Sequence, residues 1–258
     1  MTTKSQKISA KTVCDDFNDP VAVVHYAHAA KNVGLWKSER RLIERFFPDP
    51  TARMLEAGCG AGRGSLGLWE LGFRHLTAFD FAEGLLEQAY WFAGEKNAVG
   101  IHFHHADATK LTAKSFPTAP FDGILFLFNG LMQIPGRRNR RKAMRGLRSV
   151  ARPGATFLFT THDRASSASE KAMWRLERLR WERGEQDPKL IEFGDRYFKD
   201  EAGRTFMHLP DREEILADLK ATGWVHTYDC LRRDLAIESA TVVDFSDECR
   251  FWVATNGT

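Results

Sequence analysis

The sequence predicts an α/β fold in which helices cover both faces of a parallel, doubly wound sheet. Two observations lead to this prediction. Short apolar segments alternate with helix-like segments through residues 38–161, and a glycine-rich loop follows the first apolar segment. Strands that alternate with helices form right-handed βαβ units, which place ligands at the carboxyl ends of the strands.

Five of the expected strands lie at residues 54–57, 76–80, 101–106, 123–128 and 156–161. Ser38 is expected to cap a helix that Pro48 ends, and residues 85–90 have the apolar periodicity of a second helix. A third helix is expected at residues 138–150. Residues 1–20 are polar, and we expect them to be loose.

The last part of the chain returns to a regular pattern. Asp211 is expected to cap a helix that has Glu214 at its third position and that Gly223 ends. Two further strands are expected at residues 224–228 and 249–254.

The loop after the first strand has glycine at every second position, at Gly58, Gly60 and Gly62, and Glu56 stands just before it. Glycine lets the backbone turn sharply and lets a ligand approach with no Cβ in the way. Asp80 ends the second strand, where a carboxylate can accept both hydroxyls of a ribose. The loop and the acid together predict a nucleotide-binding corner.

The dinucleotide fingerprint Gly-x-Gly-x-x-Gly does not fit this loop, because its third glycine, counted from Gly58, would fall on Arg63. A nicotinamide dehydrogenase is therefore disfavoured. The pattern that fits is Glu-x-Gly-x-Gly-x-Gly, which resembles motif I of the class I methyltransferases that use S-adenosylmethionine. The resemblance extends over residues 26–254. Phe128-Asn129-Gly130, Arg152-Pro153-Gly154 and His162-Asp163 are similar to a bacterial branch of small-molecule methyltransferases.

This resemblance implies a mostly parallel seven-stranded sheet with an antiparallel edge strand. Residues 165–210 interrupt the pattern, and we interpret them as an insertion after strand five and a substrate cap. The implied organisation is an N-terminal helical lid, a cofactor-binding core, the insertion, and a C-terminal part that completes the sheet. These units correspond to residues 1–50, 51–164, 165–210 and 211–258.

The cofactor that the resemblance implies is S-adenosylmethionine. Glu56 and the three loop glycines would line its methionine end, Asp80 would hold its ribose, and Phe81 would pack on its adenine. Further contacts are implied for Asp107 and Ala108, at the adenine amino edge, and for Phe128 and Asn129, beside the sulfonium. Arg63 either pairs with the cofactor carboxylate or faces solvent.

Two aromatic residues, Tyr26 and Trp36, precede the core. In similar proteins such residues cover the cofactor, and a methyl sulfonium over an aromatic face gains ~0.5–2 kcal/mol. Packing of the first helix is the alternative explanation for both residues.

The acceptor is expected to be a small molecule that is methylated on nitrogen or oxygen. His162 follows the fifth strand and is a candidate general base, because an unperturbed pKa of ~6.5 suits that role. Alternatively, it only hydrogen-bonds the loop after that strand. Trp181 and Tyr197 of the insertion are candidate acceptor contacts, and a satellite core is the alternative for them.

The chain is mildly basic, with 37 lysines and arginines against 34 acids and a net charge of +3. Eight basic residues and no acid lie within residues 137–152, on a helix expected to present a basic outer surface. A solvated face is the favoured interpretation, and nucleic acid is not an expected partner. The rival hypotheses are an RNA methyltransferase that uses this helix and a non-enzymatic module that only binds the cofactor.

Other classes of function find little support. The four scattered cysteines suit a reducing cytoplasm, and no signal peptide or membrane span is expected. His102, His104 and His105 lack the companion ligands of a metal site, so no metal is expected. The oligomeric state is left open.

Overall fold

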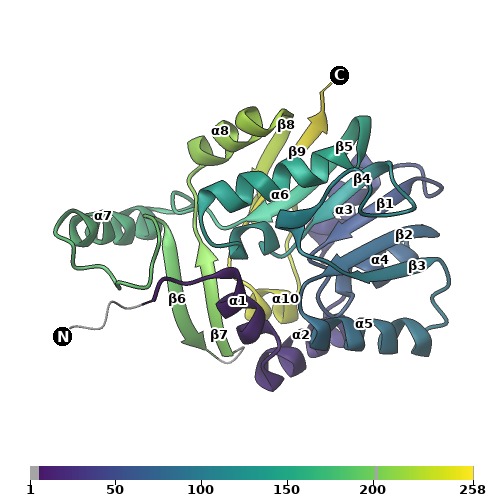
Figure 1. Ribbon diagram of the computed structural model, residues 1–258, viewed down its shortest axis with the longest axis horizontal. Helices are drawn as coiled ribbons and strands as arrows, with labels where there is room; N and C mark the ends of the chain where they lie inside the picture. The colour runs from purple at the N-terminus through teal and green to yellow at the C-terminus, as the bar shows by residue number, and fades with distance from the viewer. Residues whose placement is uncertain (1–5, 201–202, 258) are drawn as a thin grey trace.

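The structure is a computed structural model that describes residues 6–200 and 203–257. Within these residues, seven strands form one sheet with the order β3-β2-β1-β4-β5-β9-β8 (Figure 1). The strands are β1 (Arg53–Ala57), β2 (His75–Asp80), β3 (Ile101–His105), β4 (Phe121–Phe126), β5 (Ala151–Thr161), β8 (Trp224–Leu231) and β9 (Arg250–Asn256). Neighbours from β3 to β5 are parallel, whereas β9 is antiparallel to both β5 and β8. The predicted seven-stranded, mostly parallel sheet is confirmed, and its antiparallel strand lies beside the edge strand β8.

Helices cover both faces of the sheet because side chains along each strand alternate between its faces. Leu55 and Ala57 of β1 pack on the face covered by α6 and α8, and Met54 packs on the opposite face. The helices are α6 (Arg137–Ser149) and α8 (Arg212–Thr222) on the first face, and α3 (Lys37–Phe46), α4 (Arg63–Glu70) and α5 (Glu83–Glu95) on the second. Figure 1 shows α6 in front of the sheet and α3 and α4 behind it.

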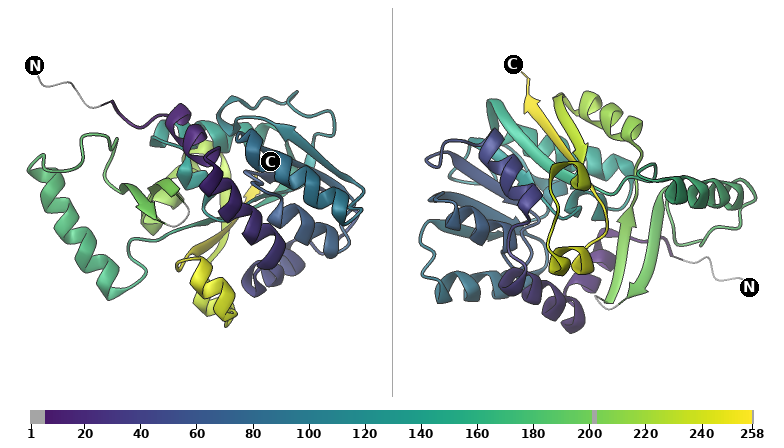
Figure 2. Two further views of the ribbon diagram at one scale, coloured as in Figure 1. Left: turned by 90° about the horizontal axis from the view of Figure 1, so that it is seen from below. Right: turned by 180° about the vertical axis from the view of Figure 1, so that it is seen from behind.

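The insertion after β5 has its own two-stranded antiparallel sheet. It comprises α7 (Ala168–Glu182), β6 (Asp195–Asp200) and β7 (Gly203–His208), with β6 paired to β7. Figures 1 and 2 show this arm projecting from the side of the main sheet, with α7 at its far end. The predicted position of the insertion, after the fifth strand, is confirmed.

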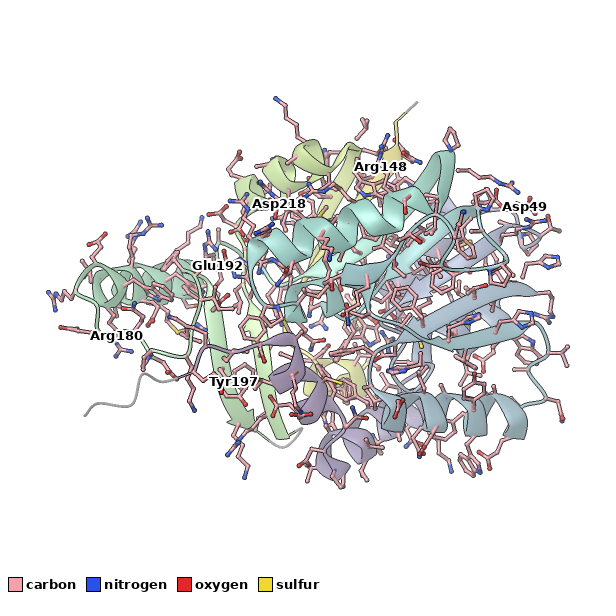
Figure 3. The ribbon with its side chains drawn as sticks, viewed as in Figure 1. Asp49, Arg148, Arg180, Glu192, Tyr197 and Asp218 are labelled. Carbon is pink, nitrogen blue, oxygen red and sulfur yellow. The ribbon has the colours of Figure 1, made fainter. Side chains whose placement is uncertain are left out.

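A buried network of charges joins the arm to the core. Arg140 of α6 is fully buried, and its Nη2 lies 2.8 Å from Glu192 Oε1. His208 of β7 lies between Asp195 Oδ1, at 2.8 Å, and Glu214 Oε1 of α8, at 2.9 Å. Figure 3 shows Glu192 at this junction. Because these buried groups have oppositely charged partners, the network fixes the arm against α6 and α8.

The basic segment at residues 137–152 forms the predicted basic outer surface only in part. The basic side chains of Arg138, Lys142 and Arg145 on α6 are exposed. Arg140 is buried, and Arg137 and Arg141 both donate to Asp218 Oδ1 at 2.7 Å. For these three arginines the prediction was wrong, because α6 lies against α8, whose carboxylates face them.

The N-terminal region is more ordered than its polar composition suggested. Helix α1 (Ala10–Phe17) begins after Ser9, whose hydroxyl accepts a hydrogen bond from the Thr12 amide at 3.2 Å. It buries Val13 and Phe17, which lie one helical turn apart. The expectation of a loose N-terminus is therefore wrong for this segment, and residues 1–5 lie outside the described residues.

Helix α2 (Pro20–Asn32) follows, and α3 then begins one residue after Trp36. Trp36 is the cap of α3, and the Glu39 side chain accepts a hydrogen bond from its amide at 2.9 Å. The predicted cap at Ser38 is therefore wrong. Ser38 is a buried residue inside the first turn of the helix.

The other elements are short: η1 (Ala108–Lys110), η2 (Gly130–Gln133), α9 (Arg232–Leu235) and α10 (Ala240–Phe245). The predicted ends of α8 are confirmed, since Asp211 caps it and Gly223 ends it in the left-handed conformation. Among the described helices, none is long and apolar enough to cross a membrane.

We expect the pH dependence of stability to reveal the role of Glu214. Burial raises the pKa of this carboxyl, but the hydrogen bond and charge of His208, with the charges of Arg140 and Arg164, outweigh burial and lower the pKa to about 2. A carboxylate with a folded-state pKa below its unfolded value of ~4.3 stabilises the fold above that pH. This contribution, on the order of 3 kcal/mol, is lost as the pH falls from ~4.3 to about 2.

Chemical unfolding of Glu214→Gln at a series of pH values tests this expectation. The variant should be less stable than the wild type at neutral pH and should lose less stability on acidification. Glu213→Gln is the matched control, because it removes the same charge from the adjacent, exposed position. Parallel pH profiles for Glu214→Gln and the wild type would contradict the prediction.

Candidate functional site

A cavity opens at the carboxyl ends of the central strands and encloses about 1040 Å³, its mouth included. The ends of β1, β2 and β4, with the loops that follow them, form one side of it. Residues from α1, α2 and α10 form the other side. Figure 2 shows α2, in purple, beside α10, in yellow, although they come from opposite ends of the chain.

Most of the residues predicted to contact the cofactor line this cavity. They are Tyr26, Glu56, Gly58, Gly60, Arg63, Asp80, Phe81, Asp107, Ala108 and Phe128. Trp36, Gly62 and Asn129 are not among the lining residues but are neighbours of residues that are. Cofactor contact stays a prediction for the whole set, whereas their convergence on one cavity is a feature of the fold.

The glycine loop leaves open space where a ligand would need it. All three glycines have positive φ, at 61° for Gly58, 52° for Gly60 and 85° for Gly62. A Cβ on Gly58 would lie 2.5 Å from Phe126 Cε2, so the loop packs tightly there. A Cβ on Gly60 would have Leu85 Cδ1, at 3.9 Å, as its nearest neighbour. The space beside Gly60 therefore belongs to the cavity.

Glu56 ends β1 as a buried carboxyl group, with 4% of its surface exposed. Burial raises its pKa to about 7, against the opposing effects of the Ser65 hydroxyl, which donates to it, and of the Arg63 charge. Gly64 lies against the same carboxyl group and leaves no room for a side chain. The first residues of α4 therefore pack closely around the Glu56 carboxyl group.

Asp80 ends β2 and holds the loop in place. Its Oδ2 accepts a hydrogen bond from the Gly60 amide at 2.8 Å, and its Oδ1 accepts one from the Ala82 amide at 2.9 Å. Burial raises its pKa, against the effect of these hydrogen bonds. Each carboxylate oxygen has a second lone pair, so both can still accept a hydrogen bond from a ligand. Asp107, after β3, caps η1 through the Thr109 amide at 2.8 Å.

Arg63 differs from the sequence-based expectation that it faces solvent. It is buried, and it forms a bidentate ion pair with Glu39 of α3, with N–O distances of 2.6 and 2.7 Å. Its Nη1 also donates to the Gly34 carbonyl at 2.8 Å. The expectation of solvent exposure is therefore wrong, and the guanidinium is already paired with Glu39. The sequence could not show this pairing, because the two residues come from separate elements.

The two aromatic residues of the predicted lid differ in position. Tyr26 lines the cavity, and burial raises the pKa of its hydroxyl to about 12, although a hydrogen bond with Gln133 opposes the shift. Trp36 is buried outside the cavity and meets Phe128 edge to face, with ring centroids 5.6 Å apart. Trp36 thus packs against Phe128, which lines the cavity. This agrees with the alternative explanation, in which Trp36 serves packing.

The turn after β4 has an unusual backbone conformation. Phe128 and Asn129 have φ values of 53° and 61°, in the left-handed region that non-glycine residues rarely adopt. Thr160 Oγ1 accepts a hydrogen bond from the Asn129 amide at 2.8 Å, which helps to hold this conformation.

His162 lies behind this turn and is not a lining residue. Its Nδ1 lies 3.1 Å from the Glu248 carbonyl, and its Nε2 lies 3.3 Å from Asn129 Nδ2. Burial lowers its pKa, so the neutral ring donates from Nδ1 and accepts at Nε2. A general base needs a nitrogen that is free to face the acceptor. The geometry therefore favours a positioning role for His162 over the predicted role of base.

Trp181 and Tyr197 lie in the insertion and are not among the residues that line the cavity. The Tyr197 hydroxyl donates to Asp16 of α1 at 3.0 Å (Figure 3), and Trp181 packs edge to face on Phe193. Both are partly buried and pack against an apolar cluster that α1, α4 and α5 share, which includes Phe17 and Leu85. Acceptor contact by these two residues stays a prediction.

Several lining residues come from outside the core, and no pattern used above predicted them. Val13 and Phe17 of α1 and Phe245 of α10 all line the cavity. A cap at Ser9, with apolar residues four apart in α1, is a pattern that would have indicated a helix there. Phe245 lies in a short helix with no comparable periodicity.

Three side chains with metal-ligand chemistry come together elsewhere in the described residues, namely Glu192, Asp195 and His208. Arg140 already pairs with Glu192, and the two nitrogens of His208 bond to Asp195 and Glu214. This cluster is part of the network that anchors the arm.

Comparison with known proteins identifies the family of the core. Residues 54–154 match a family described as a methyltransferase domain. A curated relative, a malonyl-acyl-carrier-protein O-methyltransferase of Erwinia pyrifoliae, is 30% identical over 135 residues, which are 52% of this chain and 47% of the relative. The chain therefore spans about half the length of this curated relative.

Solved structures show the same fold. An S-adenosylmethionine-dependent methyltransferase from Methanosarcina mazei has a TM-score of 0.65 at 18% identity, over 84% of this chain and 97% of that one. The magnesium protoporphyrin IX methyltransferase of Synechocystis, with bound S-adenosylhomocysteine, has a TM-score of 0.60 at 15% identity, over 96% and 99%. At such identities the likeness shows the fold alone. With the family match, it shows that residues 54–154 form the methyltransferase domain of a chain with the class I, S-adenosylmethionine-dependent methyltransferase fold.

Proposed function

We propose that the protein is an S-adenosylmethionine-dependent methyltransferase that modifies nitrogen or oxygen of a small acceptor. The observation that supports this most is the open space beside Gly60, in a cavity that Glu56 and Asp80 also line. The cavity combines polar groups at the strand ends with apolar walls from α1, α2 and α10, as small-molecule sites commonly do. The family match over residues 54–154 supports the reaction class.

In this proposal the residues at the strand ends hold successive parts of the cofactor. Glu56 and the loop glycines take the methionine end, Asp80 takes the ribose beside Phe81, and Asp107 with Ala108 takes the adenine edge. The cofactor supplies a methyl carbon on a positively charged sulfur, so an acceptor lone pair forms the new bond while the carbon–sulfur electron pair returns to sulfur and the acceptor proton passes to water. The chain contributes alignment of the reacting atoms, which can be worth ~7–11 kcal/mol.

Residues outside the core complete the site in this proposal. The helices within residues 1–50 form a lid, because α1 and α2 line the cavity. The insertion at residues 165–210 acts as a cap through α1, which Tyr197 holds by its hydrogen bond to Asp16. We also propose a cytoplasmic location, since none of the four cysteines, all within the described residues, forms a disulfide.

The rival functions have weaker support. An RNA methyltransferase would need the basic segment at residues 137–152, but six of its eight basic residues contact acids or carbonyl groups of neighbouring elements, namely Arg137, Arg140, Arg141, Arg145, Arg148 and Arg152. A cavity at the strand ends that α1, α2 and α10 cover also suits a small acceptor better than a nucleic acid chain. A non-enzymatic module would bind the cofactor without turnover.

We expect saturable binding of S-adenosylmethionine and S-adenosylhomocysteine, and no binding of NAD, in titration calorimetry. The physical reason is that the loop offers open space beside Gly60 but breaks the dinucleotide fingerprint at Arg63. Conversion of the cofactor to S-adenosylhomocysteine with a panel of small amines and phenols then separates an enzyme from a binding module. Binding of NAD alone would overturn the proposal.

A methyl group added to Gly60 should weaken cofactor binding, because it would occupy the open part of the cavity. We expect Gly60→Ala to raise the dissociation constant for S-adenosylhomocysteine at least ~10-fold, or ~1.4 kcal/mol. Gly154→Ala is the matched control: Gly154 also has positive φ and open surroundings, but it lies at an exposed position in β5. Equal affinities for the two variants would show that Gly60 does not face the ligand.

Cofactor affinity should also rise with pH through about 7, the pKa of Glu56. A positively charged ligand favours the ionised carboxylate, so affinity is lost as the pH falls and Glu56 takes up a proton. Binding to Glu56→Gln should be weaker and independent of pH in this range. Glu70→Gln, at the far end of α4, controls for the loss of an acidic group. A wild-type affinity that stays constant from about pH 6 to about pH 8 would refute this role.

A further inference from the structure

The cavity has a second region in which Tyr26 is the only expected cofactor contact among the described lining residues. Its walls come from α1, α2, η2 and α10 and from the segment after η2. The residues concerned are Phe17, Tyr26, Gln133, Ile134, Pro135 and Phe245. With the exceptions of the Tyr26 hydroxyl and the Gln133 amide, their side chains are apolar.

Aromatic rings form a continuous surface along this region. Phe17 and Tyr26 have ring centroids 5.5 Å apart, and Tyr26 meets Phe128 at 6.0 Å. Phe128 stacks on Phe245 at 5.4 Å, with an angle of 27° between the planes. His25 stacks on Phe245 in turn, at 4.7 Å. Such a surface suits a flat ring, because offset and edge-to-face contacts add ~0.5–1.5 kcal/mol per pair beyond burial.

The charged groups of the cavity already have partners within the protein. Among the described lining residues, the charged side chains are Glu56, Arg63, Asp80 and Asp107. Arg63 is the single cation of this set, and its guanidinium already donates hydrogen bonds to Glu39 and to the Gly34 carbonyl. An acceptor with a carboxylate or phosphate group would therefore bury its charge without a counter-ion, which is strongly unfavourable.

Gln133 supplies the directional contact that an uncharged acceptor needs. It lines the cavity with Tyr26 and interacts with the hydroxyl of that residue, whose pKa it lowers. An amide offers donors and an acceptor, so it can accept a hydrogen bond from a hydroxyl or amino group and leave the nucleophilic lone pair free. Tyr26 itself remains protonated at neutral pH, since burial raises its pKa to about 12.

We propose that the methyl acceptor is an uncharged, ring-bearing molecule with one hydroxyl or amino group as its nucleophile. Its ring lies against Phe17, Phe128 and Phe245, and Gln133 orients its nucleophilic group toward the cofactor end. This inference rests on the proposed function and specifies its substrate class. Gln133 is then a positioning residue, and the acceptor proton leaves to water, because the proposed function assigns the described acidic lining residues, Glu56, Asp80 and Asp107, to the cofactor.

Two matched probes test the substrate class: 2-naphthol and 6-hydroxy-2-naphthoate, which share the ring and the nucleophile and differ by one carboxylate. Calorimetry of each probe with the protein, with and without S-adenosylhomocysteine, gives the affinities, and methyl transfer to each gives the activity. We expect 2-naphthol to bind at least about 100-fold more tightly and to be the better acceptor.

Variants locate the ring and the orienting amide. Phe245→Ala should weaken 2-naphthol binding ~10-fold or more and leave the affinity for S-adenosylhomocysteine unchanged. Val243→Ala, on the exposed side of the same helix, is the control. Gln133→Arg should reverse the preference, so that 6-hydroxy-2-naphthoate binds better than 2-naphthol. A merely structural role of Gln133 would not reverse a selectivity.

The outcomes separate this inference from the proposed function. Equal or tighter binding of the carboxylate probe by the wild type overturns the substrate class, even if the cofactor binds. Equal losses of naphthol and cofactor affinity in Phe245→Ala also overturn it, as does failure of 2-naphthol and other neutral bicyclic alcohols and amines to bind. Failure to bind either adenosyl compound instead overturns the proposed function, and the measurements without cofactor still decide the acceptor preference.

Discussion

A buried ion pair between Arg63 and Glu39 connects the parts that make the cavity. Glu39 accepts two hydrogen bonds from Arg63 and a third from the Trp36 amide, and Arg63 also bonds to the Gly34 carbonyl. The guanidinium lies 5.6 Å from the ring centroid of Phe128. A buried charge that loses its partner is strongly destabilising, so neither residue can change alone. The glycine loop, the start of α3 and one aromatic wall are therefore held in one fixed arrangement.

A second network has the same physical basis but a different role. The insertion is attached to α6 and α8 by buried charges, with Glu214 bonded to His208 at the root of the arm, and by apolar residues such as Trp174 and Met207 that join the core. From this base the arm reaches back to α1. Tyr197 bonds to Asp16, and the Lys7 ammonium donates to the Leu190 carbonyl. The arm thus contacts the residues behind the cavity wall, and it influences the cavity through α1.

The parts of this structure that the sequence predicted depend on local patterns. Alternating strands and helices, with glycines and acids at strand ends, were enough to place Gly60 and Asp80 on one cavity, because parallel strands end at one edge. The partner of Arg63 and the burial of Arg140 were missed, since both depend on contacts between elements distant in sequence. The lid was predicted only in outline, because the position of Phe245 is set by tertiary packing rather than by periodicity.

The turn at Phe128 and Asn129 places a constraint on how this protein can vary. Two successive non-glycine residues in the left-handed region cost on the order of 1–3 kcal/mol each, and neighbouring hydrogen bonds must offset that cost. Glycine at position 129 would relieve the strain but would also release the backbone that aims the Phe128 ring. The chain therefore keeps a left-handed backbone at Phe128 and Asn129 that lowers its stability. Thr160 of β5 and His162, just after it, both bond to Asn129, so changes at these two positions are constrained by the conformation that aims the Phe128 ring.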